Sequence, residues 1–318
     1  MTLFDTEFRR RCEYLDQAAR RSWGSRFLGR RLDRRWAGGS EFVGHSDYTC
    51  GDDFRYIDWP ICARHDELLT RQYRGSEDRI VYLLVDCSPG MRLGTPAKFD
   101  VARRLAGALG TMALANLDRV GVVAVADRVV AELPPVRGRQ RAFRLYRFLD
   151  ELQTSAAPVK LRSAAEAFVQ QRPQRGTTVV ISDLFDPAGF EPAIDLLAQR
   201  GFPPYLLQVV DEREIDPHLS GGVTLVDVAT GRSRRTYLED LDLVNYRRVF
   251  QEFIASCRGY CARRSIGILQ TTTGTPVQES VLRVIRTATS RMYAPCDRSP
   301  VTRSEEHTSE LQSPLNIS

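Results

Sequence analysis

Lysine is almost absent from this chain, although basic residues are abundant. Only Lys98 and Lys160 occur among the 45 basic residues, so the other 43 are arginines, a bias typical of a GC-rich genome. The arginines are spread along the chain among acidic residues, whereas a nucleic-acid footprint needs basic residues clustered on one face. The one locally basic stretch is RFLGRRLDRRW, residues 26–36, which we interpret as a solvated face or a partner surface.

Long apolar runs and metal-binding cysteine pairs are missing as well. The longest apolar runs, IVYLLV (80–85) and VGVVAVA (120–126), are far shorter than the roughly 20 residues of a membrane-spanning helix. The first residues are charged and amphipathic, unlike a secretory signal. The seven cysteines form no CxxC pair and only four histidines are present, which excludes a zinc site by spacing. We therefore expect a cytoplasmic protein with reduced thiols and no membrane span.

The last fifteen residues differ in composition from the rest. SEEHTSELQSPLNIS, residues 304–318, contains no Arg, Ala, Val or Gly. It resembles translated sequencing-adapter read-through, and a natural disordered C-terminus is the alternative. We expect a non-native or disordered tail with the true C-terminus missing, and we exclude this segment from the prediction of the fold.

The pattern of apolar residues predicts three parts before this tail. Residues 1–21 include an amphipathic helix over 6–21, and residues 22–78 form a small β-rich subdomain with short strands at 41–43, 54–59 and 68–73. Over residues 79–298, buried-type strands alternate with helices. This alternation predicts an α/β fold with a doubly wound, mostly parallel sheet.

Two of the predicted strands end in an aspartate that precedes a turn. Asp86 ends YLLVD and Asp183 ends VVISD, while Ser88 follows two residues after Asp86. Ligands of open α/β sheets bind beyond the carboxyl ends of the strands, so these side chains are candidates for one shared site. Carboxylate and hydroxyl oxygens suit Mg²⁺ or Mn²⁺. The alternative is that the aspartates accept backbone N–H groups of the turns that follow.

At this point the chain resembles the von Willebrand factor type A fold, whose metal site uses Asp-x-Ser-x-Ser with a later Thr and Asp. Here the motif reads Asp86-Cys87-Ser88-Pro89-Gly90, so glycine replaces the second serine. The threonine position falls near Val159, with Thr154 and Ser155 slightly earlier. The resemblance implies a degenerate site in which Asp86, Ser88 and Asp183 hold Mg²⁺ or Mn²⁺ weakly.

A second resemblance covers roughly residues 20–290. GGSEF (38–42), YTCGDDFRYIDW (48–59), AR (63–64) and LVDCSPGM occur in the order found in the domain-of-unknown-function 58 family. The residues that match its motif are Glu41, Phe42, Tyr48, Gly51, Asp52, Asp53, Arg55, Ile57, Asp58, Trp59, Ala63 and Arg64. Ser46 stands where an arginine is common. The resemblance implies a partnership with AAA+ ATPases of the MoxR type.

We interpret the GDD…IDW motif as a structural or interface motif rather than a catalytic one. Gly51 permits a tight turn, and Asp52 and Asp53 can accept its N–H groups. As a strand, FRYIDW would place Asp58 on one face and Trp59 on the other. We expect Arg55 and Arg64 to pair with the aspartates, because an unpaired buried carboxylate is costly. We predict no catalytic residue.

Three functions remain open. The first is a non-enzymatic adaptor that works with a MoxR-type ATPase on an unknown client protein, with the ATPase activity in the partner because this chain has no GxxxxGK[ST] motif. The second is an Mg²⁺-dependent hydrolase that uses Asp86, Asp183 and the GDD carboxylates. The third is a nucleic-acid-binding module, which is the least favoured.

Overall fold

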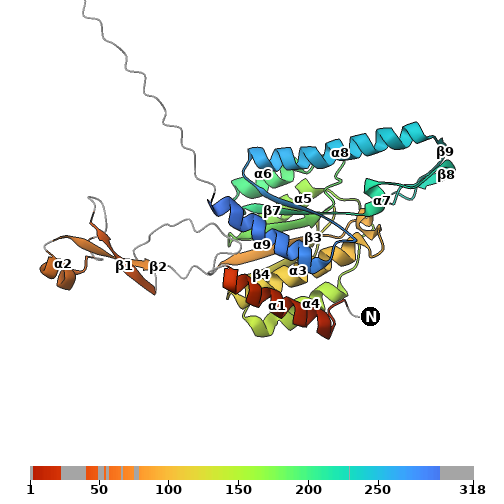
Figure 1. The fold of residues 1–318 in the computed structure, drawn as a ribbon. Coiled ribbons are helices and arrows are strands. Elements are labelled where there is room, and N and C mark those ends of the chain that lie inside the picture. The colour runs from red at the N-terminus through yellow and green to blue at the C-terminus, as the bar shows by residue number, and fades with distance from the viewer. Residues whose placement is uncertain are drawn as a thin grey trace, which may run out of the picture.

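A six-stranded sheet lies at the centre of the computed structural model, with helices on both of its faces (Figure 1). The structure describes residues 3–22, 41–48, 54, 57–65, 67–74, 79–228 and 230–293. The strand order is β10-β7-β6-β3-β4-β5, and β5 alone is antiparallel to its neighbour. The strands are β3 (Ile80–Asp86), β4 (Arg119–Val125), β5 (Val129–Arg137), β6 (Thr177–Ser182), β7 (Pro204–Val210) and β10 (Gly267–Thr272). The predicted α/β class with a mostly parallel sheet is confirmed.

The central strand β3 shows why its sequence is apolar throughout. All seven of its residues are buried. Val81, Leu83 and Val85 belong to the core on one face of the sheet, and the alternate residues Tyr82 and Leu84 belong to the core on the other. A strand covered on both faces needs no polar side chains for solvent.

Each face of the sheet has its own layer of helices. One core includes residues of α1 (Thr6–Ser22), α3 (Lys98–Ala115), α4 (Ala142–Glu151) and α9 (Val277–Tyr293). The other includes residues of α5 (Leu161–Gln170), α6 (Glu191–Gln199) and α8 (Asp240–Arg263). Cys257 and Cys261 of α8 are fully buried in this second core, as their helical spacing predicts.

The N-terminal helix α1 packs on the first of these layers. It contacts α3 and α9, and the Phe8 side chain is buried. The ring of Phe4 stacks on Tyr146 of α4, with ring centroids 5.1 Å apart. Gly107 of α3 lies directly under Phe4, because a Cβ at this position would be 2.6 Å from the phenylalanine ring. The predicted helix over 6–21 is therefore present and is part of the sheet core.

The β-rich segment forms a separate small unit that Figure 1 shows to one side of the sheet. The strands predicted at 41–43 and 68–73 are present as β1 (Glu41–Asp47) and β2 (Leu69–Arg74), and the two pair antiparallel. The predicted strand over 54–59 is wrong, because helix α2 (Trp59–His65) begins inside it and Ile57 makes only an isolated bridge to Thr70. Asp58 precedes the helix and Pro60 lies in its first turn, a pattern that favours a helix start over a strand.

A hairpin follows β7 at the carboxyl end of the sheet. The short helix α7 (Glu212–Ile215) leads into β8 (Gly221–Val226) and β9 (Ser233–Leu238), which pair antiparallel as a hairpin. Figure 1 shows this hairpin and the start of α8 extending away from the sheet. We call residues 221–228 and 230–249 the arm. The described part of the chain also has two short 3₁₀ turns, η2 (Pro89–Arg92) and η3 (Arg139–Arg141), and segments 23–40 and 304–318 lie outside it.

We predict that Phe8→Ala destabilises the whole sheet domain. The side chain is 8 % exposed and packs edge-on against both Phe4 and Tyr146, so its removal leaves a cavity under α1. We expect the free energy of unfolding in urea to fall by about 3 kcal/mol. Tyr14→Ala on the same helix is the control, since Tyr14 is 71 % exposed and its loss changes stability by at most about 0.5 kcal/mol. Equal effects of the two substitutions would contradict the packing of α1.

Candidate functional site

The candidate site lies at the carboxyl ends of the neighbouring strands β3 and β6. Asp86 ends β3 and Asp183 follows β6, and both are buried. One carboxylate oxygen of Asp86 accepts the Ser88 backbone N–H at 2.8 Å, and the other accepts the Ser182 hydroxyl at 2.5 Å. The structure therefore brings together Asp86, Ser88 and Asp183, the three residues predicted to share a site.

Burial dominates the ionisation of Asp86. Loss of water and the nearby negative charge of Asp183 raise the pKa of Asp86 to about 6, against the hydrogen bonds from Ser182 and Ser88 that favour the carboxylate. At neutral pH, Asp86 is thus a carboxylate held in place by hydroxyl and backbone donors.

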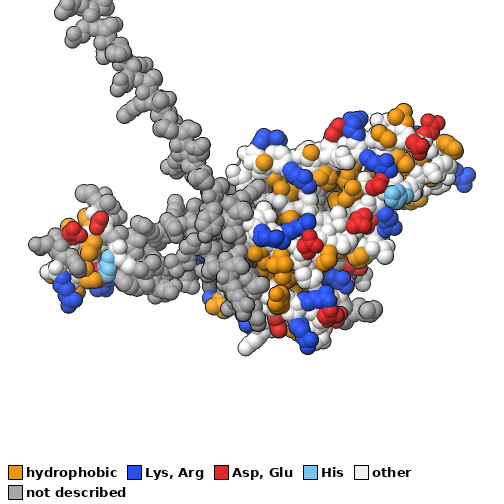
Figure 2. All heavy atoms as spheres, in the orientation of Figure 1, with side chains coloured by type: hydrophobic (Ala, Val, Ile, Leu, Met, Phe, Trp, Pro, Cys, Tyr) orange, Lys and Arg blue, Asp and Glu red, His pale blue; other side chains and the backbone are white. Residues whose placement is uncertain are grey.

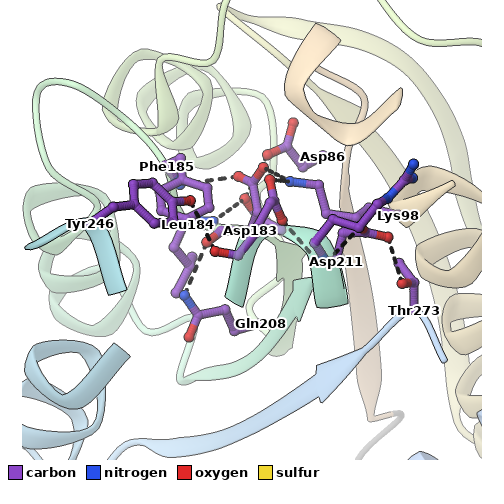
Figure 3. Close-up of polar contacts among 12 residues, drawn as sticks. Asp86, Lys98, Asp183, Leu184, Phe185, Gln208, Asp211, Tyr246 and Thr273 are labelled. Atoms are coloured by element: carbon purple, nitrogen blue, oxygen red, sulfur yellow. Dashed lines mark hydrogen bonds and ion pairs between the residues drawn. The ribbon is translucent and has the colours of Figure 1, made fainter. Parts of the chain in front are cut away.

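A buried lysine completes the site, and sequence reasoning missed it. Lys98 is the first residue of α3, and its side chain is fully buried. Its Nζ lies 2.8 Å from Oδ2 of Asp183 (Figure 3). The same Nζ lies 2.6 Å from Oε1 of Glu214. Burial by itself lowers the pKa of Lys98, but the two carboxylates outweigh it and leave the pKa above its usual value. Lys98 is therefore a permanent cation at the carboxyl end of the sheet.

Glu214 connects this lysine to the ends of two further strands. Asp211 follows β7 and caps α7: its backbone N–H donates to Glu214 Oε2 at 2.8 Å, while its own carboxylate accepts the backbone N–H of Arg213. The second oxygen of Asp211 accepts the hydroxyl of Thr273, just beyond β10, at 2.8 Å. Burial opposes ionisation of Asp211, but the hydrogen bonds from the Arg213 side chain, the Thr273 hydroxyl and the Arg213 backbone N–H prevail and lower its pKa. One polar network thus links the ends of β3, β6, β7 and β10.

The turn after β6 has an unusual backbone that orients the network. Leu184 is buried and has a φ of 65°, a left-handed conformation that costs roughly 1–2 kcal/mol for a residue with a Cβ. Gln208 stabilises the turn by donating to the Asp183 carbonyl at 3.0 Å, and Ser182 Oγ accepts the Leu184 N–H at 2.9 Å. The turn brings the ring of Phe185 within 5.5 Å of the Lys98 ammonium.

The residues present do not fit a divalent cation. Lys98 already occupies one oxygen of Asp183, and the position predicted for the threonine ligand is the buried, apolar Val159. Thr154 instead accepts a hydrogen bond from Arg92 at 2.7 Å. Within the described ranges, no group of three or more His, Cys, Asp and Glu side chains is placed to hold a metal ion. Mg²⁺ requires nearly octahedral oxygen ligands, whereas an ammonium group needs only a few acceptors.

The GDD…IDW motif is only partly described. Gly51, Asp52, Asp53 and Arg55 lie outside the described residues, and for Glu41 and Phe42 only the backbone in β1 is described. Arg64 and Trp59 are exposed on α2, and Trp59 is 63 % exposed. The interpretation of this motif as structural or as an interface stays a prediction for these residues.

Asp58 is buried, and two residues that the sequence did not suggest bind it. It accepts hydrogen bonds from Arg71 Nε at 2.8 Å and from His45 Nε2 at 2.8 Å. Of the arginines predicted as partners, Arg64 is exposed on α2 and Arg55 lies outside the described residues. His45 and Arg71 are directly opposite each other in the β1–β2 pair, so both reach the same carboxylate. Arg71 first and His45 second hold the pKa of Asp58 well below its usual range. Asp58 thus ties α2 to the hairpin.

The missed site residues carried one usable signal. A chain that uses arginine at 43 of its 45 basic positions keeps lysine at position 98, at the start of a helix that follows the Asp86 loop. The choice of lysine against such a bias indicates a position where a guanidinium group does not fit. Asp211 and Glu214 had the spacing of a capping box, which predicts a helix start but no partner for Lys98.

We predict that Asp86→Asn removes a pH dependence of stability. The pKa of about 6 in the folded protein lies above the roughly 4 of an unfolded chain, so the unfolded state releases this proton first as the pH rises. The stabilisation is complete below about pH 4 and is lost as the pH rises through 6. We expect the free energy of unfolding of the unsubstituted protein, relative to Asp86→Asn, to fall by about 2 kcal/mol between pH 4 and pH 7.

Urea unfolding at several pH values measures this difference. Asp47→Asn is the control, because Asp47 is an exposed aspartate of β1. Its curve is expected to run parallel to that of the unsubstituted protein. A parallel curve for Asp86→Asn as well would show that folding leaves the pKa of Asp86 unchanged, and that the burial argument is wrong.

The chain has relatives among uncharacterised mycobacterial proteins. It is 27 % identical over 188 residues to proteins of Mycobacterium tuberculosis and Mycobacterium bovis, over 58 % of this chain. The match spans 59 % of the length of these relatives. None of the helices within the described residues is long and apolar enough to cross a membrane.

Two solved structures and one family model also match. The conserved hypothetical protein BatB from Bacteroides thetaiotaomicron is 16 % identical with a TM-score of 0.42, over 67 % of this chain and 99 % of that one. An aerotolerance-related membrane protein from Bacteroides fragilis is 16 % identical with a TM-score of 0.37, over 65 % and 98 %. The family model "Protein of unknown function DUF58" matches residues 45–256, two thirds of the chain. The chain therefore belongs to the DUF58 family.

Proposed function

We propose that this chain is a non-enzymatic interaction protein that works with a MoxR-type AAA+ ATPase in the assembly or maturation of other proteins. The observation that carries the proposal is the contrast between two neighbouring features at the carboxyl end of the sheet. The polar site there is buried and its charged groups bind one another, whereas the arm beside it exposes apolar side chains. A buried polar site whose groups bind one another suits a structural role. An arm that exposes apolar side chains suits a surface for a partner protein.

The buried site offers little to a substrate. Asp86, Lys98 and Asp183 are each at most 3 % exposed, and each is hydrogen-bonded within the network. A hydrolase needs a nucleophile or an activated water that a substrate can reach. Asp52 and Asp53, the GDD carboxylates of the hydrolase alternative, lie outside the described residues. The hydrolase alternative is therefore weaker.

The arm carries a group of exposed apolar residues. Figure 2 shows apolar side chains along it, interleaved with charged ones. The exposed apolar residues of the arm are Leu225, Val226, Val228, Tyr237, Leu241, Val244, Tyr246 and Val249. Such grouped apolar side chains on a protein surface mark sites of protein–protein interaction. The arm is anchored to the network, because Tyr246 donates its hydroxyl to the Glu214 carbonyl at 2.9 Å and Arg247 pairs with Asp216.

The resemblance to the von Willebrand factor type A fold supports the same role. The strand order with one antiparallel edge strand and the site beyond β3 and β6 agree with an adhesion-type crevice. Since the ATP-hydrolysing motif is absent from the sequence, the partner would supply the energy and this chain would supply recognition of a client.

We predict that Leu241→Asp combined with Val244→Asp weakens binding to the purified MoxR-type ATPase of the source organism at least about tenfold. Both side chains lie on the arm and are 67 % and 55 % exposed, so charges there leave the fold intact but cannot be buried in an interface. Biolayer interferometry in the presence of Mg²⁺ and ATP measures the affinity.

Leu117→Asp is the matched control. Leu117 is 63 % exposed and lies between α3 and β4, at the opposite end of the sheet; its φ of 66° is one that aspartate tolerates. We expect its affinity to equal that of the unsubstituted protein. Absence of ATPase binding by the unsubstituted protein would refute the partnership, and equal loss in both variants would refute the role of the arm.

A further inference from the structure

The ammonium group of Lys98 binds Asp183, one of the aspartates that the adhesion-type pattern gives to a divalent cation. We propose that Lys98 is the permanent cation of this crevice, that it takes the place of Mg²⁺ or Mn²⁺, and that the crevice works without added metal. The proposal concerns the occupant of the crevice, so it does not depend on which partner binds the protein.

The contacts of Lys98 are those of a bound cation. Its side chain is 0 % exposed, and those of Asp183 and Glu214 are 4 % and 16 % exposed. The two carboxylates come from different elements, the end of β6 and α7, and meet only at the ammonium. Without a cation between them, these buried negative charges would repel each other and Asp86. The lysine supplies the neutralisation for which related sites use a metal.

The absence of two metal ligands from this chain fits the replacement of the metal ion by the Lys98 ammonium. Gly90 replaces the second serine, and a Cβ there would lie 3.3 Å from Asp183 Oδ2, tighter than an ordinary van der Waals contact. Val159 replaces the threonine and is buried among apolar residues. Two hydroxyl ligands are thus missing at the positions where Mg²⁺ needs them, while the structure supplies an ammonium donor instead.

The choice of lysine over arginine fits the shape of the position. A guanidinium is planar and broad, whereas an ammonium is a compact point charge with three donors. The face of Phe185 lies 5.5 Å from Nζ, and its ring stacks on Phe253 of α8. The aromatic ring covers the ammonium on a side that the carboxylates leave open, which favours a small cation there.

The proposal predicts how partner binding depends on divalent cations. In a metal-dependent crevice, a partner carboxylate completes the coordination of the ion, so chelators abolish binding. Here the cation is covalently part of the chain and already has two carboxylates. If the proposed adaptor role holds, partner binding therefore survives removal of divalent cations.

Titration with MnCl₂ followed by calorimetry tests the proposal on the protein alone. We expect no saturable heat for the unsubstituted protein, and the same melting temperature in EDTA and in millimolar Mg²⁺. Removal of the ammonium in Lys98→Ala or Lys98→Gln frees the carboxylates, so we expect these variants to bind Mn²⁺ at least about tenfold more tightly than the unsubstituted protein. Adding Asp183→Asn to Lys98→Ala is expected to abolish this gain.

Lys160→Ala is the control, because Lys160 is the other lysine, directly precedes helix α5 and is exposed. It is expected to behave like the unsubstituted protein. The proposal would be overturned if the unsubstituted protein bound Mn²⁺ saturably and Asp183→Asn removed this binding. It would also be overturned if neither Lys98 variant bound Mn²⁺. If these variants are unfolded without metal, Mn²⁺ is expected to restore their cooperative melting, and a lack of restoration would equally overturn it.

Discussion

The ion pairs of Lys98 with Asp183 and Glu214 are the interaction on which the carboxyl end of the sheet depends. A fully buried ammonium is stable only where carboxylates surround it, and here they come from elements 85 and 116 residues away in sequence. Through the capping box of Asp211 and its bond to Thr273, the same charge network reaches β7 and β10. Folding must therefore bring α3, β6 and α7 together before the lysine can be buried.

This dependence explains why the loop after β6 has a strained backbone. Leu184 adopts a left-handed conformation, and Gln208 and Ser182 hold the turn by hydrogen bonds. The result is that Asp183 and Phe185 both face Lys98. The cost of the strained residue is offset by a carboxylate and an aromatic ring placed on a buried cation. The arm starts from this network, so its position beside the crevice follows from the same contacts.

The sequence was sufficient for the sheet and for half of the site. Continuous apolar runs such as β3 identify buried strands, and parallel strands in one sheet place Asp86 and Asp183 at a common edge. Lys98 and Glu214 were beyond such reasoning, since a periodic pattern assigns an element but does not say which side chains meet across the fold. The strand predicted over 54–59 failed because helix α2 begins at Trp59, where Asp58 before the helix and Pro60 in its first turn favour a helix start. The pairing of Asp58 with Arg71 depends on the register of β1 and β2, which no local pattern specifies.

A crystal structure of the protein grown with excess MnCl₂, with diffraction data collected at the manganese absorption edge, tests the central claim most directly. The account predicts that Lys98 Nζ remains between Asp183 and Glu214, with no anomalous peak beside these carboxylates. An anomalous peak within coordination distance of Asp86 and Asp183, with the Lys98 side chain turned away, would contradict it.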